Sequence, residues 1–328
     1  MIVITGGAGF IGSNLVAALE ERGYTSLAVI DRLGADDKWR NLAGRELAAL
    51  VPIDRGWEFL DEAADRIEAV FHMGASSSTT ERDADFVLQN NFTLSQRYWR
   101  WCAEHRVPLL YASSAATYGD GAGGFEDDGS IAGLAKLQPL NAYGWSKHLF
   151  DRWVAREATA GNAAPPYWAG LKFFNVYGPN EYHKGGQQSV VAHLFPRAAR
   201  GEAARLFRSY RPDYADGGQL RDFVSVSDVV EIMLWLYEAR PSCGLFNAGT
   251  GIARSFADLA RSVYSALGRN AEIEYIDMPE ALRPNYQYFT EARMERLTAL
   301  GYPGRPTPLE EGVGRYVRDF LAAPNRYR

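Results

Sequence analysis

The feature that most constrains the fold is a glycine-rich turn, "GGAGFIG" at residues 6–12, set between two segments of different periodicity. The apolar run "MIVIT" (1–5) before it predicts a buried strand, and "IGSNLVAALEERG" (11–23) after it has the spacing of a helix closed by a glycine. Glycine permits the tight turn and lets backbone N–H groups approach a pyrophosphate, which the helix N-terminus attracts. This order of elements predicts an α/β nucleotide-binding fold, with the cofactor on Gly6, Gly9 and Gly12.

An acidic residue ends the second predicted strand, "SLAVID" (26–31). Asp31 lies nineteen residues after Gly12, where a dinucleotide-binding fold is expected to meet the adenosine ribose. Its carboxylate would accept a hydrogen bond from a ribose 2′-hydroxyl, which favours NAD. Arg32 and Lys38 are two cations that could instead clamp a 2′-phosphate. We expect NADP as the cofactor, with NAD as the alternative.

Strands and helices alternate along the first half of the chain. Further strands are predicted at 68–75, 108–114 and 167–176, and helices at 86–105 and 140–158. Such alternation is typical of βαβ units, and so of a Rossmann-type, doubly wound parallel sheet. After residue 176 the pattern breaks into short strands, glycine-rich turns and two later helices, at 256–268 and 309–322. We therefore expect a dinucleotide-binding domain over 1–175, to which 221–250 returns, and a smaller, irregular α/β substrate-binding lobe over 176–220 and 251–328.

Charge and composition narrow the class of protein. The formal net charge is −5 and the pI is near 5.7, which argues against a nucleic-acid-binding protein, whose surface would be basic. Two cysteines give neither a disulfide framework nor a metal-ligand spacing, so no metal site is expected. The sequence opens without a basic segment ahead of an apolar one, and its apolar runs stay short of membrane-spanning length. We expect a soluble, cytoplasmic protein that binds neither nucleic acid nor membranes.

Three residues at predicted strand and helix ends suit acid–base chemistry on a hydroxyl group. Tyr143 and Lys147, in "YGWSK", lie one turn apart on one face of a predicted helix. The pKa of an unperturbed tyrosine is about 10, and a neighbouring ammonium group lowers it towards a range useful for a general base. Ser114 ends the strand "PLLYASS" at the edge where open parallel sheets bind ligands, and can hydrogen-bond a reacting hydroxyl. We predict that Ser114, Tyr143 and Lys147 are catalytic.

The chain resembles the extended short-chain dehydrogenase/reductase family, in its nucleotide-sugar epimerase and dehydratase branch, along essentially its whole length. The similar stretches are "GGAGFIGSN", "GASSSTT", "YASSAATYG", "PLNAYGWSK", "FNVYGPNEYHKG", "RDFVSVSDV" and "FNAGTG". Within the branch, "SSSTTE" and "YHKG" are most similar to the epimerases that act on ADP-heptose at C6. The resemblance implies that a tightly bound cofactor transiently oxidises and re-reduces the sugar, and that Lys184 is a second acid/base opposite Tyr143. The alternative for His183 and Lys184 is pairing with substrate phosphate or solvent.

The resemblance also implies binding residues, one position at a time. Arg221 is the candidate for the substrate diphosphate, because a guanidinium binds phosphate in a bidentate fork; the alternative is a structural pair with Asp222. Further substrate contacts are implied for Ser114, Asn175, His193, Phe207 and Tyr286. The cofactor contacts implied, besides Tyr143, Lys147 and Lys184, are Phe10, Ile11, Met73, Gly74, Ala75, Ser76, Ser77, Asn90 and Val176.

Three departures from the family's pattern fall around the predicted nucleotide-sugar pocket. Met73 stands where the family has a glutamate, Gly186 where it has a serine, and segment 208–219 is longer and carries Asp213 and Asp216. These departures leave another nucleotide-sugar epimerase or dehydratase as an alternative. A further alternative, from a different class, is a non-catalytic dinucleotide-binding sensor, which would have no need of a tuned phenol. The resemblance further implies a closed homo-oligomer, such as a pentamer, and a place in lipopolysaccharide core biosynthesis.

Overall fold

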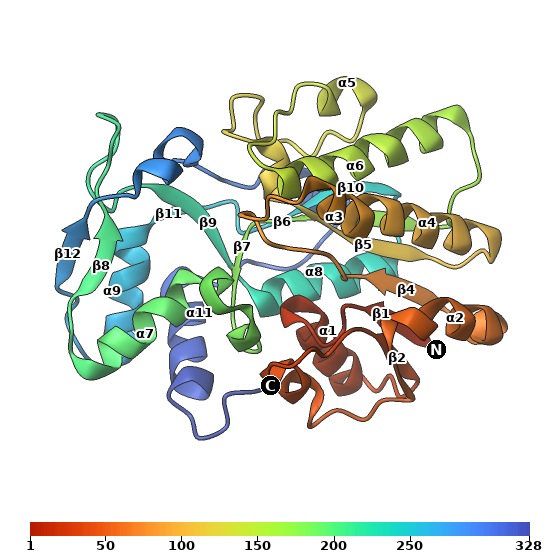
Figure 1. The fold of residues 1–328 in the computed structure, drawn as a ribbon, viewed down its shortest axis with the longest axis horizontal. Coiled ribbons are helices and arrows are strands. Elements are labelled where there is room, and N and C mark those ends of the chain that lie inside the picture. Colours follow the sequence, from red (N-terminus) through yellow and green to blue (C-terminus); the bar gives the residue numbers. More distant parts are fainter.

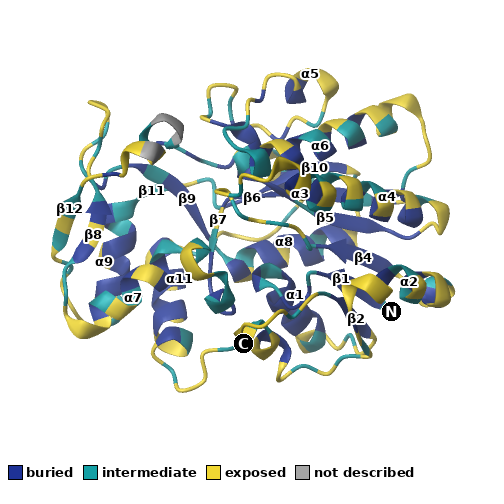
Figure 2. Ribbon diagram, viewed as in Figure 1, coloured by how far each residue is buried: buried dark blue, intermediate teal, exposed yellow. Residues whose placement is uncertain are grey.

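A seven-stranded parallel sheet forms the larger part of the molecule (Figure 1). The computed structural model describes residues 1–328, apart from the side chains of residues 281, 284 and 285. The strand order is β10-β6-β5-β4-β1-β2-β3, and every pair is parallel. Most side chains of these strands are buried (Figure 2), as their apolar runs predict for a sheet covered on both faces. The strands are β1 (Ile2–Thr5), β2 (Leu27–Ile30), β3 (Ala49–Val51), β4 (Ala69–His72), β5 (Leu109–Ser114), β6 (Trp168–Phe173) and β10 (Gly244–Ala248).

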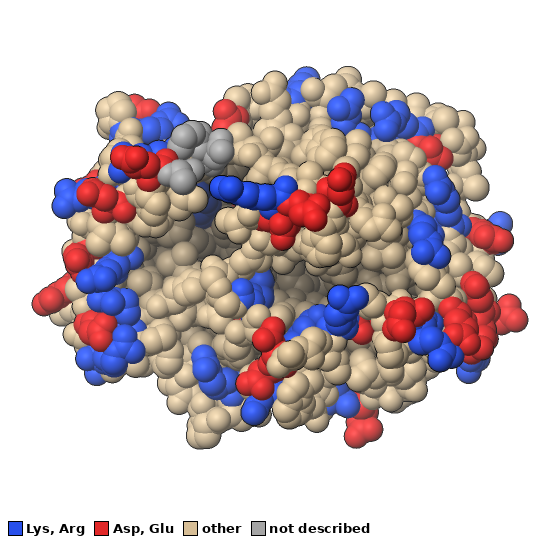
Figure 3. Space-filling model, in the orientation of Figure 1, with Lys and Arg blue, Asp and Glu red and all other residues tan. Residues whose placement is uncertain are grey.

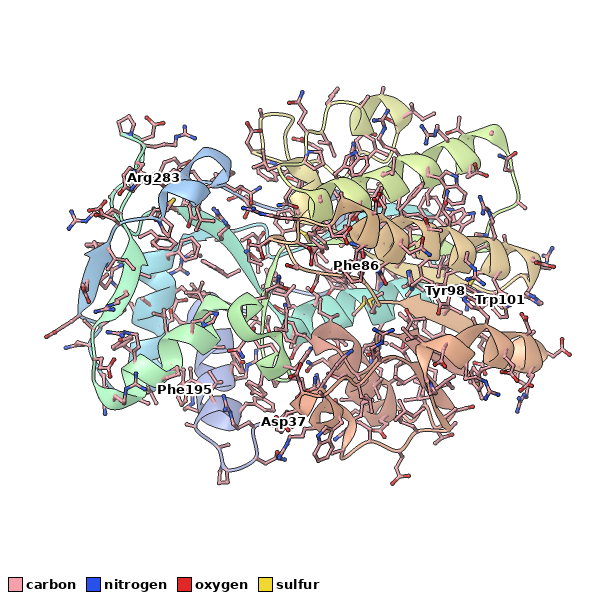
Figure 4. The ribbon with its side chains drawn as sticks, viewed as in Figure 1. Asp37, Phe86, Tyr98, Trp101, Phe195 and Arg283 are labelled. Atoms are coloured by element: carbon pink, nitrogen blue, oxygen red, sulfur yellow. The ribbon has the colours of Figure 1, made fainter. Side chains whose placement is uncertain are left out.

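Helices cover both faces of this sheet. α1 (Phe10–Glu21) packs beside α8 (Val226–Ala239) on one face, and α4 (Leu94–Glu104) and α6 (Ala142–Ala160) lie on the other (Figure 1). Trp101 of α4 (Figure 4) donates its indole N–H to Asp61 of α2 (Gly56–Ala63) at 2.8 Å. The remaining helical segments here are η1 (Asp37–Leu42), η2 (Ile53–Arg55), η3 (Ala64–Arg66), α3 (Ala84–Leu88), the π-turn η4 (Gln89–Thr93), η5 (Ala115–Tyr118) and α5 (Ile131–Leu134).

A second, smaller lobe has its own sheets and its own apolar core. β7 (Asn175–Tyr177), β9 (Leu220–Ser225) and β11 (Ala253–Ser255) form one sheet, and β8 (Ala204–Phe207) and β12 (Ile273–Ile276) form another. The core includes Leu194, Leu206, Leu259 and Val313 and is separate from the core around the large sheet. The helical segments of this lobe are η6 (Tyr182–Gln187), α7 (Val190–Arg200), α9 (Phe256–Ala266), η7 (Glu280–Asn285), α11 (Leu309–Tyr316) and η8 (Val317–Leu321); α10 (Glu295–Ala299) instead contacts β10.

The connections between the lobes differ in detail from the sequence-based expectation. The strand predicted at 167–176 is two strands, because the backbone leaves the large sheet at Phe174 and β7 joins the small one. Segment 221–250 divides in the same way: β9 pairs in the small sheet, whereas α8 and β10 belong to the large one. We propose a domain boundary that the chain crosses at both points. Within the described residues, no helix is long and apolar enough to cross a membrane.

Candidate active site

Two connected cavities lie at the carboxyl ends of the parallel strands, where open α/β sheets bind ligands. The smaller, of about 250 Å³, is lined by the glycine turn, Asp31, residues 73–75, Tyr143 and Lys147. The larger, of about 990 Å³, lies between the large sheet and the second lobe. Ser77 and Lys184 line both, so the two cavities meet at these side chains. Figure 3 shows this face of the molecule hollowed between the lobes.

The glycine turn has the shape that a pyrophosphate requires. Gly6 has φ +67°, and a Cβ at this position would lie 2.6 Å from Gly74 Cα. A Cβ on Gly12 would overlap the Gly6 carbonyl oxygen. Gly9 is the N-cap of α1, whose first turn contains no acidic residue. The N-terminus of α1 therefore offers free N–H groups and a positive helix-dipole end beside the smaller cavity, which fits a dinucleotide diphosphate.

Asp31 and Lys38 form a partly buried ion pair at the end of β2. Lys38 Nζ lies 2.7 Å from Asp31 Oδ1, with the two side chains 20% and 8% exposed. Asp31 also accepts hydrogen bonds from the backbone N–H groups of Ala8 at 2.9 Å and of Arg32 at 2.7 Å. Arg32 is exposed beside this pair. The negative charge expected to exclude a 2′-phosphate is thus compensated by Lys38 at close range.

The loop after β4 is held by Asn91, which is not among the predicted cofactor contacts. Asn91 is buried; its side-chain oxygen accepts from Ser76 N at 2.8 Å, and its amide donates to Ser76 O at 2.9 Å. Asn90 instead donates to Phe86 O within its own helix, at 2.8 Å, and lines neither cavity. Both residues lie in the π-turn η4, which advances the helix face by one residue. Helical periodicity alone therefore could not tell which asparagine faces the loop.

The predicted catalytic residues Ser114, Tyr143 and Lys147 come together at the ends of β5 and α6. Ser114 and Tyr143 line a third cavity of about 270 Å³, which shares Asn175 with the larger one. Lys147 is buried and donates to Ala112 O at 2.8 Å. Ser114 also caps η5, since its hydroxyl accepts from Ala116 N at 3.1 Å.

The electrostatics of Tyr143 differ from the expectation. Burial raises the pKa of Tyr143, and its hydrogen bond with Ser114 partly opposes that rise. Burial lowers the pKa of Lys147 to about 8, which the charge of Asp151 partly opposes. In the protein alone, the Lys147 ammonium donates to the Ala112 carbonyl oxygen, and the predicted lowering of the Tyr143 pKa by Lys147 is not found. An oxidised nicotinamide ring, which carries a positive charge, would supply that field when bound.

Lys184 lies on the turn η6, opposite the glycine turn. Its ammonium nitrogen is 5.3 Å from the centre of the Phe10 ring. Burial lowers the pKa of Lys184, and Glu181 partly opposes this. Burial also lowers the pKa of His183 to about 4, aided by Lys38 and Lys184, so His183 is neutral at pH 7. Lys184 is thus the residue of this turn that can carry or exchange a proton between the two cavities.

Buried polar contacts hold this turn in place. The Glu181 carboxylate accepts from Ser189 N, from Ser189 Oγ at 2.7 Å and from Tyr316 OH at 3.0 Å. Asn180, with φ +71°, donates to Ser13 Oγ at 3.0 Å and accepts from Arg328 N at 3.0 Å. These contacts join the turn to α1, α7, α11 and the last residues of the chain.

Most of the predicted substrate residues line the larger cavity. They are Asn175, Phe207, Arg221 and Tyr286, and Val176, predicted on the cofactor, lies there with them. His193 is exposed on α7 and lines none of the three cavities, so the structure does not bring it to the others. Thr79 and Gln187 also line the larger cavity; neither was predicted, although Thr79 belongs to the "SSSTT" motif.

Arg221 is free of the acidic neighbour that might have neutralised it. Its guanidinium donates to the carbonyls of Leu220 and Gln287, and lies 5.3 Å from the centre of the Tyr286 ring. The Asp222 carboxylate instead accepts from the N–H groups of Thr250 at 2.8 Å, Gly251 at 2.9 Å and Ala292 at 3.0 Å. The alternative of an Arg221–Asp222 pair is therefore wrong, and Arg221 faces the cavity as a cation.

The departures from the family pattern lie at the cavity walls. Met73 lines the smaller cavity and Gly186 the larger. In the long loop, Asp213 pairs with Arg211 at 3.0 Å and Asp216 accepts from Ser209 N at 2.8 Å, so both extra aspartates bond within the loop. Arg283 of η7 (Figure 4) donates to Tyr210 OH at 3.0 Å and ties the loop to η7 within the second lobe. Within the described residues, no cluster of acidic, histidine or cysteine side chains could hold a metal ion.

Comparison with known proteins defines the class. The model of the NAD dependent epimerase/dehydratase family matches residues 2–249, so the chain belongs to that family and uses a nicotinamide dinucleotide. A protein of Nitratidesulfovibrio vulgaris named ADP-L-glycero-D-manno-heptose-6-epimerase is 48% identical over 329 residues, covering 100% of both chains. The structure of the Helicobacter pylori protein of that name has a TM-score of 0.79 at 27% identity, covering 98% of this chain and 96% of the other. UDP-glucose 4-epimerase of Thermus thermophilus, in complex with NAD, has a TM-score of 0.75 at 26% identity, covering 98% and 99%.

These findings confirm the predicted fold class and the family resemblance. The seven-stranded parallel sheet and the glycine turn are the Rossmann-type part of the prediction, and the full-length relatives extend the likeness through the second lobe. The family is one of enzymes, which is inconsistent with the non-catalytic sensor.

Proposed function

We propose that this protein epimerises ADP-D-glycero-D-manno-heptose at C6 to the L-glycero form, without net oxidation. The observation that carries the proposal is the place of Lys184, which lines both cavities, lies beside the Phe10 ring of the glycine turn and shares the smaller cavity with Tyr143. The full-length relatives that bear the name of this activity support the choice of substrate. A 4-epimerase of a different nucleotide sugar is the second candidate, supported by Met73 and Gly186 at the cavity walls.

Epimerisation requires a proton acceptor and donor for each orientation of one carbon. The dinucleotide supplies the chemistry of accepting a hydride and returning it. Tyr143, with Ser114 beside it, would hold the proton of the sugar hydroxyl in one orientation, and Lys184 in the other. Lys147 would hold the cofactor in the smaller cavity, which it lines together with Tyr143. Arg221, uncompensated by Asp222, would bind the substrate diphosphate.

The cofactor is NADP in this proposal. Lys38 neutralises Asp31, and Arg32 is exposed next to it, so a 2′-phosphate would meet two cations and one compensated carboxylate. We expect the Arg32→Ala, Lys38→Ala double variant to lose at least about tenfold more affinity for NADP than for NAD, because only NADP carries the phosphate. Equal losses, measured by titration of the purified protein, would show that Arg32 and Lys38 do not discriminate between the two cofactors.

The protein is also proposed to act in the cytoplasm, in lipopolysaccharide core biosynthesis, as a closed homo-oligomer such as a pentamer. The family resemblance supports these statements. The oligomer is tested by light scattering of the purified protein at micromolar concentration, where a monomeric mass would reject it.

The activity is tested directly by incubating the protein with ADP-D-glycero-D-manno-heptose and, separately, with UDP-galactose, while NMR follows the stereochemistry at C6 and C4. Inversion at C6 of the heptose, with no net turnover of added dinucleotide, is expected. Inversion of UDP-galactose alone would favour the second candidate. Loss of water from either sugar would indicate a dehydratase, although "SSAATYG" (113–119) offers no acidic pair beside Ser114.

A further inference from the structure

A buried ion pair lies next to β5, the strand that ends at Ser114. Lys172 Nζ, on β6, is 2.8 Å from Asp151 Oδ2, on α6, and the two side chains are 1% and 0% exposed. The Asp151 carboxylate also accepts from Ser113 Oγ at 2.7 Å and from Tyr111 OH at 3.2 Å. A buried ion pair is by itself weak evidence for stability, because desolvation offsets the attraction. The question is what else this carboxylate does.

The Asp151 carboxylate binds the residues on both sides of Ala112, whose carbonyl oxygen accepts a hydrogen bond from Lys147. Tyr111 and Ser113 are alternate residues of β5, so their side chains point to the same face, towards α6. Between them, Ala112 O accepts the hydrogen bond from Lys147 Nζ at 2.8 Å. Asp151 follows Lys147 by one helical turn on the same side of α6. One carboxylate therefore fixes both neighbours of Ala112 relative to the helix that carries Lys147.

The same network reaches Ser114. Lys172 Nζ donates to Thr117 Oγ1 at 2.6 Å, and Thr117 Oγ1 donates to Ser114 O at 2.8 Å. Gly170 stands opposite Tyr111 in the register of β5 and β6, and a Cβ there would overlap the Tyr111 ring. The neighbouring strand thus leaves the space that the Tyr111 side chain needs to reach Asp151.

We propose that Asp151 is a positioning residue, which sets the place of the Lys147 ammonium and of Ser114 through Tyr111, Ser113 and Lys172. It lines none of the described cavities. This inference rests on the roles of Tyr143 and Lys147 in the proposed function, but not on the identity of the sugar. The titratable groups around Lys147 are Asp151 on α6, His72 on β4 and Tyr143, which lines the same cavity. Of these, Asp151 is the one whose charge favours the ammonium form.

The test removes the charge pair as a unit. Asp151→Asn alone would leave Lys172 buried and unpaired, which is strongly destabilising, whereas Asp151→Asn with Lys172→Met removes both charges at similar volume. The matched control is Glu20→Gln with Arg45→Met, a partly buried pair at 2.7 Å near the far end of α1. Thermal unfolding establishes that both double variants are folded before kinetics are compared.

In the Asp151/Lys172 double variant we expect kcat to fall at least about tenfold with KM within about threefold, because positioning is lost but the substrate cavity is intact. The alkaline limb of the kcat profile should move to lower pH, since the charge favouring the Lys147 ammonium is gone. NADP affinity should fall by about tenfold, because Lys147 is a proposed cofactor contact. The control should change none of these. A folded variant with wild-type kcat and pH profile would overturn the proposal.

The dinucleotide measurement separates this inference from the proposed function. If the wild-type protein does not convert ADP-heptose, the proposed function fails, and the NADP titration then decides the role of Asp151. Wild-type NADP affinity in the folded double variant would overturn the positioning role in that case.

Discussion

The two candidate acid–base residues, Tyr143 and Lys184, lie on different kinds of structure. Tyr143 and Lys147 lie on α6, against the middle strands of the large sheet, with the Asp151 network behind them. Lys184 lies on the short 3₁₀ turn η6, directly before Gly185 at φ +53°, and this turn is held by contacts from several distant segments. One candidate is thus part of a rigid layer, and the other is carried by a turn that joins the lobes.

In the proposed function Tyr143 and Lys184 serve the two orientations of one carbon, and the difference in their supports suits each residue to its orientation. A rigid residue can define the position of the reacting hydroxyl, whereas the opposite residue must accommodate a second orientation of the substrate. Burial lowers the pKa of Lys184, which makes a neutral amine more accessible near neutral pH. We therefore expect variants of the two sides to fail in different ways.

The largest effect is expected on the rigid side. Tyr143→Phe should lower kcat by about 10²–10⁴-fold, because it removes the phenolic proton and leaves the ring in place. Bound dinucleotide should remain near the wild-type amount, since the glycine turn is unchanged. NMR of the heptose product and the absorbance of bound cofactor measure both. Substantial epimerisation by this variant would assign the chemistry to another residue.

The Lys184→Met variant tests the acid/base role proposed for Lys184 on the turn η6. It should lower kcat for net epimerisation by about 10²-fold, with a smaller change in KM, because the second orientation loses its acid/base. An analogue with an aldehyde at the terminal carbon allows hydride transfer to be watched in one orientation, and the losses from Tyr143→Phe and Lys184→Met should not add there. A rise in KM with wild-type kcat would mean that Lys184 only neutralises phosphate, and the contrast between the two sides would disappear.

Acidification should lower the free energy of unfolding, because a histidine on the rigid side is buried in its neutral form. Burial lowers the pKa of His72 to about 3, and His72 bonds Thr5 Oγ1 at 2.7 Å and Ser95 Oγ at 3.0 Å. The unfolded chain takes up this proton near pH 6.5 and the folded chain does not, so stability is present above pH 6.5 and is lost as pH falls towards 3. At pH 5 the loss from His72 is about 2 kcal/mol.

Denaturant unfolding at pH 7 and pH 5 measures this loss. His72→Asn should flatten the pH dependence of stability, whereas His105→Gln, at an exposed position, should leave it unchanged. An unchanged slope in His72→Asn would mean that other groups cause the acid sensitivity. By the same relation, His148 and His183, whose pKa values burial lowers to about 4, should add to the loss, with the share of the half-buried His183 reduced by its exposure to solvent.

The smallest effect is expected at Arg221, in the second lobe. Arg221→Ala should raise KM for any nucleotide-diphosphate sugar by about tenfold and leave kcat nearly unchanged, because the diphosphate is equally charged before and during reaction. Arg221→Lys should recover part of the affinity. An unchanged KM would reassign Arg221 to its contacts with Gln287 and Tyr286.

Much of the rigid side was readable from the sequence. The glycine turn follows from a strand, a helix and glycines at fixed spacing, and Tyr143 and Lys147 follow from a separation of one helical turn. These are local patterns, since backbone geometry fixes which face a residue takes within one element. Five strands of the large sheet were predicted for the same reason, although the segment at 167–176 breaks at Phe174; β3 and β10 were not predicted as strands.

What the tertiary structure decided depends on contacts between distant residues. Asn91 rather than Asn90 meets Ser76 because a π-turn shifts the helix face, and Asp222 turns to Thr250 and Ala292 rather than to Arg221. The hydrogen bonds of the Asp151 network join residues up to fifty-five positions apart. Buried polar groups must find partners wherever the packed chain offers them. The sequence by itself therefore determined the fold class and the Tyr143–Lys147 pair, while only the folded chain determined which polar groups neutralise, hold or free the residues around them.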